Sequence, residues 1–220
     1  MKKSISNKIP SEYLFLKNIE QRAIERLPVK SKLKLKERAL ASAHLGVLLA
    51  NEMELGKKEQ TIVWLSGLLH DIGKGKIWRK YLELYPESLT PQTREQLKAN
   101  LRRMHTNRAI TILDGFTQHI QDYKKVNPSR EESRMLETVK RDIREHERTD
   151  GNHTPTGMIM TIADAYAAYS REYPYRPKLK TPAQRIRRIR NKYSHPNYTP
   201  VIDTLERLAP YLRQNVPHLE

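Results

Sequence analysis

The sequence contains no cysteine. This absence excludes a disulfide framework, a zinc site built on thiolates and catalysis by a cysteine nucleophile. Any metal must therefore be bound by histidine, aspartate and glutamate. No apolar run approaches the roughly 20 residues that a membrane-spanning helix needs, and residues 1–6 are not followed by the apolar stretch of a secretory signal. We therefore expect a cytoplasmic protein with no membrane partner.

Acidic residues are scarce relative to basic ones. The 25 Asp and Glu stand against 41 Lys and Arg, which gives a formal charge of +16 over 220 residues. A positive potential of this kind attracts anions, and phosphates are the obvious candidates. The excess gathers in residues 26–38 and 171–192. These segments are either contacts for nucleotide or nucleic acid, with RNA a candidate partner for residues 171–192, or simply solvated helix faces.

Hydrophobic residues make up 37% of the chain, and they recur at helical spacing. This spacing predicts helices at residues 11–27, 31–55, 59–70, 90–115, 128–146 and 157–170, followed by two short ones near 186–189 and 201–212. We expect Gly115 to end the fourth helix. Alternation typical of strands is nowhere sustained. The sequence therefore predicts an all-α fold, a compact single-domain helical bundle over residues 31–220 that follows an N-terminal tail and short helix at residues 1–30.

Six polar residues stand where the predicted helices otherwise carry apolar or small side chains. His70 and Asp71 end the most apolar helix, and Asp164 lies between two alanines on a segment suited to burial. An unpaired carboxylate there would be costly, so it needs a cation or hydrogen-bond donors. The six residues are His44, His70, Asp71, His105, His146 and Asp164.

One arrangement accounts for all six residues: they converge on bound metal inside the bundle. Neutral imidazoles with carboxylates suit iron or manganese, and also zinc, cobalt or nickel, better than calcium or magnesium. Six ligands exceed a single tetrahedral site, and Asp71 could bridge two ions roughly 3.5–4 Å apart. The alternative is that the six are separate core residues, each with its own hydrogen bonds.

Several motifs resemble those of the HD-domain metal-dependent phosphohydrolase superfamily, and of its HD-GYP branch in particular. Residues 70–74, His-Asp-Ile-Gly-Lys, are similar to the His-Asp doublet that defines the superfamily. His44 matches a histidine of the preceding helix, and His105 matches a histidine further downstream. Residues 145–151, Glu-His-Glu-Arg-Thr-Asp-Gly, partly match the His-His-Glu-Arg-aromatic-Asp-Gly motif of the branch, and residues 163–176 resemble its last motif.

This resemblance covers roughly residues 31–212. It implies a phosphodiesterase that hydrolyses cyclic di-GMP or a related cyclic dinucleotide, with a metal-bridging hydroxide as the nucleophile. It implies two divalent transition-metal ions rather than three, because Leu40 stands where members with three ions carry glutamate. The implied catalytic residues are Asp71 and Lys74. The implied metal ligands are His44, His70, Asp71, His105, Glu145, His146 and Asp164. The implied substrate-binding residues are Lys74, Arg148, His153, Arg171 and Arg176.

Besides Leu40, the sequence departs from the branch at several further places, among them the following three. Glu145 replaces the first histidine of a tandem pair, His153-Thr154-Pro155 replaces Gly-Tyr-Pro, and Ala167 replaces the second aspartate of the last motif. Two other functions therefore stay open. One is an HD-type phosphohydrolase that acts on another nucleotide or on an RNA phosphate. The other is a non-enzymatic module that binds nucleotide or RNA through residues 171–192.

Overall fold

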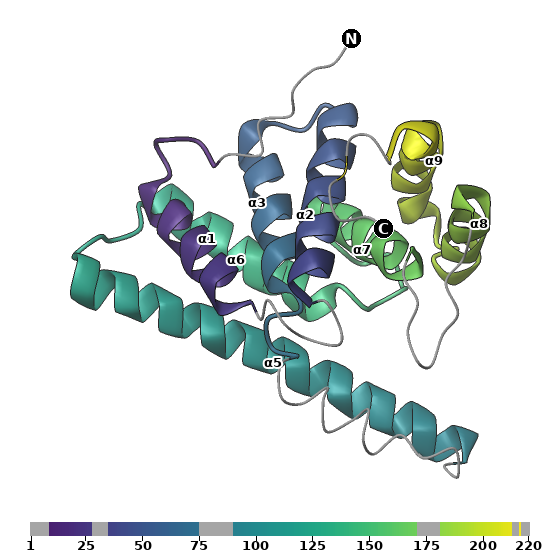
Figure 1. Cartoon of the computed structure of the whole chain (residues 1–220), viewed down its shortest axis with the longest axis horizontal. Coiled ribbons are helices and arrows are strands. Elements are labelled where there is room, and N and C mark those ends of the chain that lie inside the picture. The colour runs from purple at the N-terminus through teal and green to yellow at the C-terminus, as the bar shows by residue number, and fades with distance from the viewer. Residues whose placement is uncertain (1–8, 28–34, 75–89, 171–180, 213–215, 217–220) are drawn as a thin grey trace.

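The computed structural model of the chain describes residues 9–27, 35–74, 90–170, 181–212 and 216. Within these ranges the chain forms helices joined by turns and loops, and none of it lies in a strand, so the predicted all-α fold is confirmed (Figure 1). The helices are α1 (Leu14–Arg26), α2 (Leu35–Glu52), α3 (Lys57–Leu69), α5 (Pro91–Lys124), α6 (Arg130–Glu145), α7 (Pro155–Tyr169), α8 (Pro182–Lys192) and α9 (Thr199–Leu208), with 3-10 turns η1 (Pro196–Tyr198) and η2 (Ala209–Tyr211). Across the described ranges, no helix combines the length and the hydropathy that crossing a membrane requires.

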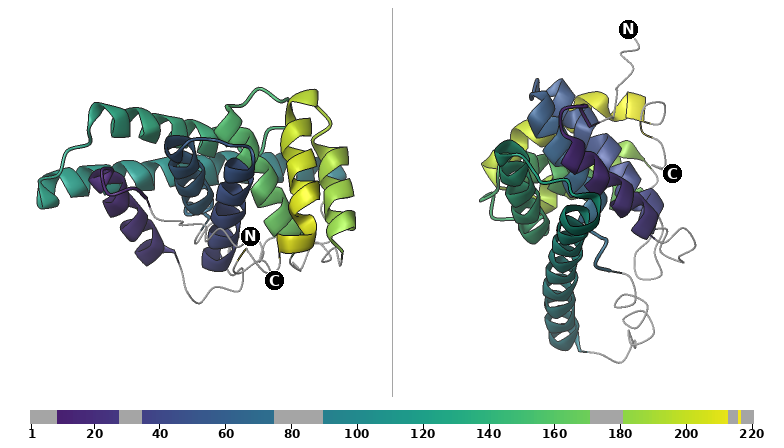
Figure 2. Two further views of the ribbon diagram at one scale, coloured as in Figure 1. Left: turned by 90° about the horizontal axis from the view of Figure 1, so that it is seen from above. Right: turned by 90° about the vertical axis from the view of Figure 1, so that its left-hand side faces the viewer.

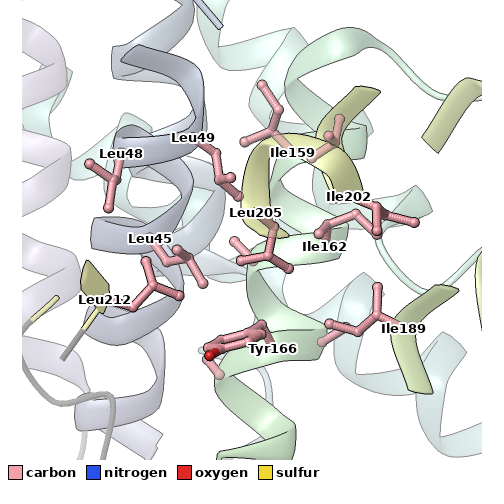
Figure 3. Close-up of a cluster of buried hydrophobic side chains, with 14 of the residues drawn as sticks. Leu45, Leu48, Leu49, Ile159, Ile162, Tyr166, Ile189, Ile202, Leu205 and Leu212 are labelled. Atoms are coloured by element: carbon pink, nitrogen blue, oxygen red, sulfur yellow. The ribbon is translucent and has the colours of Figure 1, made fainter. Parts of the chain in front are cut away.

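Helix α2 packs against both α3 and α7 (Figure 1). Helices α2 and α3 approach each other closely at Gly67 of α3, where an added Cβ would lie 2.7 Å from the Cα of Ala43. On its side toward α7, α2 contributes to a hydrophobic core that also contains residues of α7, α8 and α9. This core includes Leu45, Tyr166 and Leu205 (Figure 3). A second core joins α1, α2, α3, α5 and α6. These two cores hold together the helices that carry the candidate site.

A capping box begins α6. The Ser129 hydroxyl accepts a hydrogen bond from the main-chain nitrogen of Glu132, and the Glu132 carboxylate accepts one from the main-chain nitrogen of Ser129. The same carboxylate accepts a 2.9 Å hydrogen bond from the main-chain nitrogen of Phe15. Glu132 therefore both starts α6 and ties it to α1.

Helix α5 is longer than the sequence predicted. We expected Gly115 to end it, but the helix continues to Lys124 and ends where Lys125 adopts a left-handed conformation with φ 55°. The apolar spacing goes on past the glycine, since Ile120 is fully buried and Phe116 packs against the same core. That burial outweighs the helix cost of glycine, which is about 1 kcal/mol. The second half of α5 packs on α1 and α6, whereas its first turns, before the buried residue Leu101, project beyond the other described helices (Figure 2).

The turn after α3 packs directly against α5. A Cβ on Gly73 would collide with the main-chain oxygen of His105 and lie 2.8 Å from the main-chain nitrogen of Ala109. Glycine is therefore needed at this close approach. The contact brings His70, Asp71 and Lys74 next to the middle of α5.

Candidate metal centre

Polar side chains from four helical segments meet in the interior of the fold. The structure brings together five of the seven predicted metal ligands: His70 and Asp71 after α3, His105 on α5, His146 after α6 and Asp164 on α7. His70, Asp71 and His105 have no exposed surface, and His146 is 2% exposed. Buried histidines and carboxylates that come together from distant parts of the chain are typical of a metal site.

These five residues form two groups that share Asp71. The histidine group consists of Asp71, His105 and His146, and the acidic group consists of His70, Asp71 and Asp164. Within each group, one candidate ligand atom from each residue lies within 4.8 Å of the others. Either group could hold a divalent cation by its donor set alone.

The imidazoles of the histidine group are oriented by the main chain. The Nδ1 of His105 lies 3.1 Å from the Leu101 carbonyl oxygen, and the Nδ1 of His146 lies 2.7 Å from that of Ile143. A carbonyl oxygen only accepts, so each Nδ1 carries the proton and each Nε2 carries a lone pair. Both Nε2 atoms are buried and have no hydrogen-bond partner. This is the tautomer and the outer hydrogen bond typical of a histidine that binds metal.

Both imidazoles of this group are neutral at ordinary pH. Burial lowers the pKa of His105 to about 3, with help from the positive charge of Lys74 and from His146. Burial also lowers the pKa of His146. A neutral imidazole is the form that can bind a cation, so no proton has to be removed first.

Arg38 on α2 reaches the acidic group. Its Nε and Nη2 donate to the Asp164 carboxylate at 3.1 and 2.8 Å, and its Nη1 lies 3.3 Å from an oxygen of Asp71. Only 9% of Arg38 is exposed. Sequence reasoning missed this residue and counted it with the basic segment 26–38. Its place among the buried residues Leu35 and Ser42, at helical spacing, was the available signal.

Other positive groups surround the same carboxylates. Lys74 forms an ion pair with Asp71, and the Nε2 of His70 lies 3.0 Å from Asp164 and 3.3 Å from Asp71. Burial alone would lower the pKa of His70, but the two carboxylates outweigh it and raise the pKa to about 9. Burial would raise the pKa values of Asp71 and Asp164, but Arg38 and His70 hold both well below the usual range. The acidic group is therefore ionised and paired.

Glu147 faces the histidine group from the segment after α6. One of its carboxylate oxygens lies 3.8 Å from the Nε2 of His105 and 3.7 Å from the Nε2 of His146, while Arg102 pairs with the other at 2.5 Å. The sequence had indicated Glu145 instead, whose carboxylate lies 3.9 Å from the guanidinium of Arg148. Glu145 is the last residue of α6, and the chain turns after it so that Glu147 points inward.

A sequence model of the HD domain matches residues 36–169, more than half of the chain, and the match includes both groups. The chain belongs to the HD-domain family. Members of this family are generally metal-dependent phosphohydrolases. A search among curated proteins found no match. The buried histidine and aspartate groups of this HD domain could hold a divalent metal ion.

His44 lies away from both groups of the HD domain. Its ring packs edge-on against Trp64, with ring centroids 4.9 Å apart, and its Nδ1 donates to the Leu40 carbonyl oxygen at 2.7 Å. His44 follows Arg38 by six residues on α2, which places the two side chains on different faces of the helix. The helix before the His-Asp doublet therefore presents an arginine, not a histidine, to the centre.

The predicted substrate-binding residues occupy several places. Lys74 is 3% exposed and lies at the centre. Arg148 is on the surface, where it pairs with Asp150, and its main-chain oxygen accepts a hydrogen bond from the Tyr198 hydroxyl. His153 is half-buried, with its ring edge-on to Tyr198, and burial lowers its pKa. Arg171 and Arg176 lie outside the described residues.

Proposed function

We propose that this HD domain is a metal-dependent phosphohydrolase whose centre is the histidine group. The observation that carries the proposal is the pair of buried, neutral imidazoles with unpartnered Nε2 atoms beside Asp71. If the two histidines were only separate core residues, the lone pairs of both Nε2 atoms would have no partner, which is unfavourable in a buried site. A shared cation satisfies both at once.

In this proposal, Asp71, His105 and His146 hold the cation, and Lys74 acts on the substrate. A bound divalent ion supplies Lewis acidity, which polarises a phosphate ester and makes water acidic enough to attack it near neutral pH. The Lys74 ammonium lies against Asp71 and can bind a phosphate oxygen as charge develops on it. Asp71, by pairing with Lys74, keeps that ammonium directed at the centre.

A finer proposal concerns the substrate, which we propose to be a cyclic dinucleotide, as in the HD-GYP branch. Residues 146–151 keep the order His-Glu-Arg-x-Asp-Gly, and His146 and Glu147 from this motif both face the centre. Arg148 and His153 follow in the loop after α6, and in this proposal they contact the part of the substrate that lies beyond the centre.

A second candidate substrate is another nucleotide or an RNA phosphate. The observation in its favour is the exposed basic surface of α8, where Arg187 and Arg188 face solvent, together with the net charge of +16. Part of that surface is neutralised within the fold, because Arg190 pairs with Asp203 and Glu206. A non-enzymatic module that binds RNA would use this surface and would have no need of the buried centre.

The test is hydrolysis by the full chain after chelation and after reloading with Mn²⁺ or Fe²⁺. The substrates are cyclic di-GMP, cyclic GMP-AMP, a linear dinucleotide, nucleoside triphosphates and a short RNA. We expect chelation to abolish hydrolysis, reloading to restore it, and Asp71→Asn to remove it. Turnover of a nucleotide or RNA with none of either cyclic dinucleotide would reject the HD-GYP proposal alone. RNA binding that survives Asp71→Asn, without hydrolysis of any substrate, would favour the non-enzymatic module.

A further inference from the structure

The two groups of the centre differ in what already surrounds them. In the acidic group, the two carboxylates of Asp71 and Asp164 are matched by two permanent cations, Arg38 and Lys74. In the histidine group, the Nε2 atoms of His105 and His146 face the Glu147 carboxylate and have no hydrogen-bond partner. The acidic group is therefore neutralised within the protein, whereas the histidine group presents two donor nitrogens without a partner, beside a carboxylate that pairs with Arg102.

Arg38 engages the same carboxylates that a cation in the acidic group would need. Its guanidinium donates three hydrogen bonds to Asp164, two of them from Nη2 at 2.8 Å, and it also lies 3.3 Å from Asp71. A guanidinium has no lone pair to offer and does not lose its proton in proteins. It therefore cannot act as a ligand, and it repels any divalent ion that would share these carboxylates.

The position of Arg38 is also fixed by the fold. Its side chain enters from the first turns of α2, and Ser42, one turn further along, donates to the same oxygen of Asp164 at 3.3 Å. His70 approaches that oxygen from the other side at 3.0 Å. Asp164 thus receives donors from three residues. For an ion to bind there, Arg38 and Ser42 would have to withdraw and His70 would have to lose the proton on its Nε2.

We propose that the centre takes a single divalent ion, held by Asp71, His105 and His146, and that the guanidinium of Arg38 stands in the acidic group where a second ion would otherwise bind. Arg38 is then a positioning residue, which supplies a fixed positive charge and orients Asp71 and Asp164. This inference rests on the proposed metal dependence, and it replaces the two ions that the sequence predicted with one.

The test is the metal content of the full chain, loaded with Mn²⁺ after chelation and then freed of excess metal. Elemental analysis counts the manganese per chain, and electron paramagnetic resonance distinguishes an isolated ion from a coupled pair. We expect one isolated manganese per chain in the wild type. His105→Ala is expected to lose it, whereas His44→Ala, a matched histidine outside both groups, is expected to keep it.

Arg38→His tests the role of the guanidinium directly. This change removes the fixed charge and introduces an imidazole on the same helix, so we expect a second manganese and a coupled spectrum. An Arg38→His protein that folds, as judged by circular dichroism, and still binds a single ion would overturn the proposal. If Arg38→His does not fold, the proposal is decided by the number of manganese ions per wild-type chain and by the loss of manganese in His105→Ala.

The single-ion proposal and the proposed hydrolytic function would fail in different ways. Two coupled ions in the wild type, or one ion that persists in His105→Ala, would overturn the inference about Arg38 while leaving metal-dependent hydrolysis intact. A wild-type protein that folds and binds no manganese, iron or other transition metal would contradict the proposed function as well.

Discussion

Each ligand histidine of the proposed centre has one ring nitrogen bound to a carbonyl one turn back in its own helix. For His105 that partner is Leu101, and for His146 it is Ile143. These contacts fix the tautomer before any ion arrives, so binding needs neither a proton loss nor a ring flip. The sequence indicated both histidines because His105 lies among apolar residues of its helix, His146 ends the next helix, and both match motifs of the family.

Charged residues at the centre were harder to predict than the histidines. Arg38 and Glu147 were not identified, because basic and acidic side chains usually face solvent and only the tertiary fold shows that these two turn inward. Asp71 and Asp164 were identified because each sits in an apolar segment. His44 was included because it lies among small residues of a predicted helix and matches a histidine of the family, whereas the structure places it against Trp64.

Asp142 offers a test at the residue scale that does not involve the centre. It is fully buried and accepts hydrogen bonds from Thr154 at 2.6 Å and Ser66 at 3.4 Å. Burial raises its pKa to about 6, although these hydroxyl groups act in the opposite direction. The fold therefore favours the protonated form, whose contribution to stability is full below about pH 4 and is lost as pH rises through 6.

We predict that Asp142→Asn, which mimics the protonated carboxyl, becomes more stable relative to the wild type as pH rises. Between pH 4 and pH 7.5 the free energy of unfolding of the variant, relative to the wild type, should increase by about 2 kcal/mol. Urea unfolding at both pH values measures this difference, and other titrating groups cancel in the comparison. A difference that stays constant across this range would contradict the raised pKa.

At the scale of elements, helical spacing of apolar residues was enough to predict the fold class and most helix positions. The length of α5 was not predicted, because Gly115 was taken as the helix end although Phe116 and Ile120 continue the apolar spacing, and the burial of Ile120 shows that the helix goes on. The close approach of the turn after α3 to α5 also depends on tertiary packing. Two glycines, Gly115 and Gly73, mark these two features.

The same substitution at the two glycines is expected to have opposite effects. At Gly115 a Cβ meets nothing within 4 Å, so Gly115→Ala should raise the free energy of unfolding by roughly 0.5–1 kcal/mol. At Gly73 a Cβ collides with the His105 carbonyl, so Gly73→Ala should lower it by about 2 kcal/mol or more and weaken Mn²⁺ binding. Chemical denaturation and manganese titration measure both effects. Destabilisation by Gly115→Ala would indicate that α5 is interrupted there.

At the scale of the whole molecule, the proposed ion joins elements that are far apart in the chain. Its ligands follow α3, lie on α5 and follow α6, so they come together only in the folded protein. An ion that binds the folded chain and not the unfolded one stabilises the fold by mass action. The histidine group therefore links metal binding to the stability of the bundle.

We predict a metal-dependent melting temperature. At a free Mn²⁺ concentration about 100 times Kd, the added stability is about 2.7 kcal/mol, which corresponds to a rise of about 5–10 °C for a chain of this size. Differential scanning calorimetry of the chelated and the reloaded protein measures the shift. The rise should be absent in His105→Ala and present in His44→Ala, and an equal rise in both variants would mean that manganese binds elsewhere.

Metal-dependent hydrolysis is tested most directly by the rate at which the chelated wild-type protein hydrolyses its substrate as Mn²⁺ is added back, with the substrate chosen from the panel above. We expect no turnover without metal, a rate that rises and saturates as one ion binds per chain, and no rescue in Asp71→Asn. Hydrolysis by the fully chelated protein at the same rate as the reloaded protein would contradict this expectation.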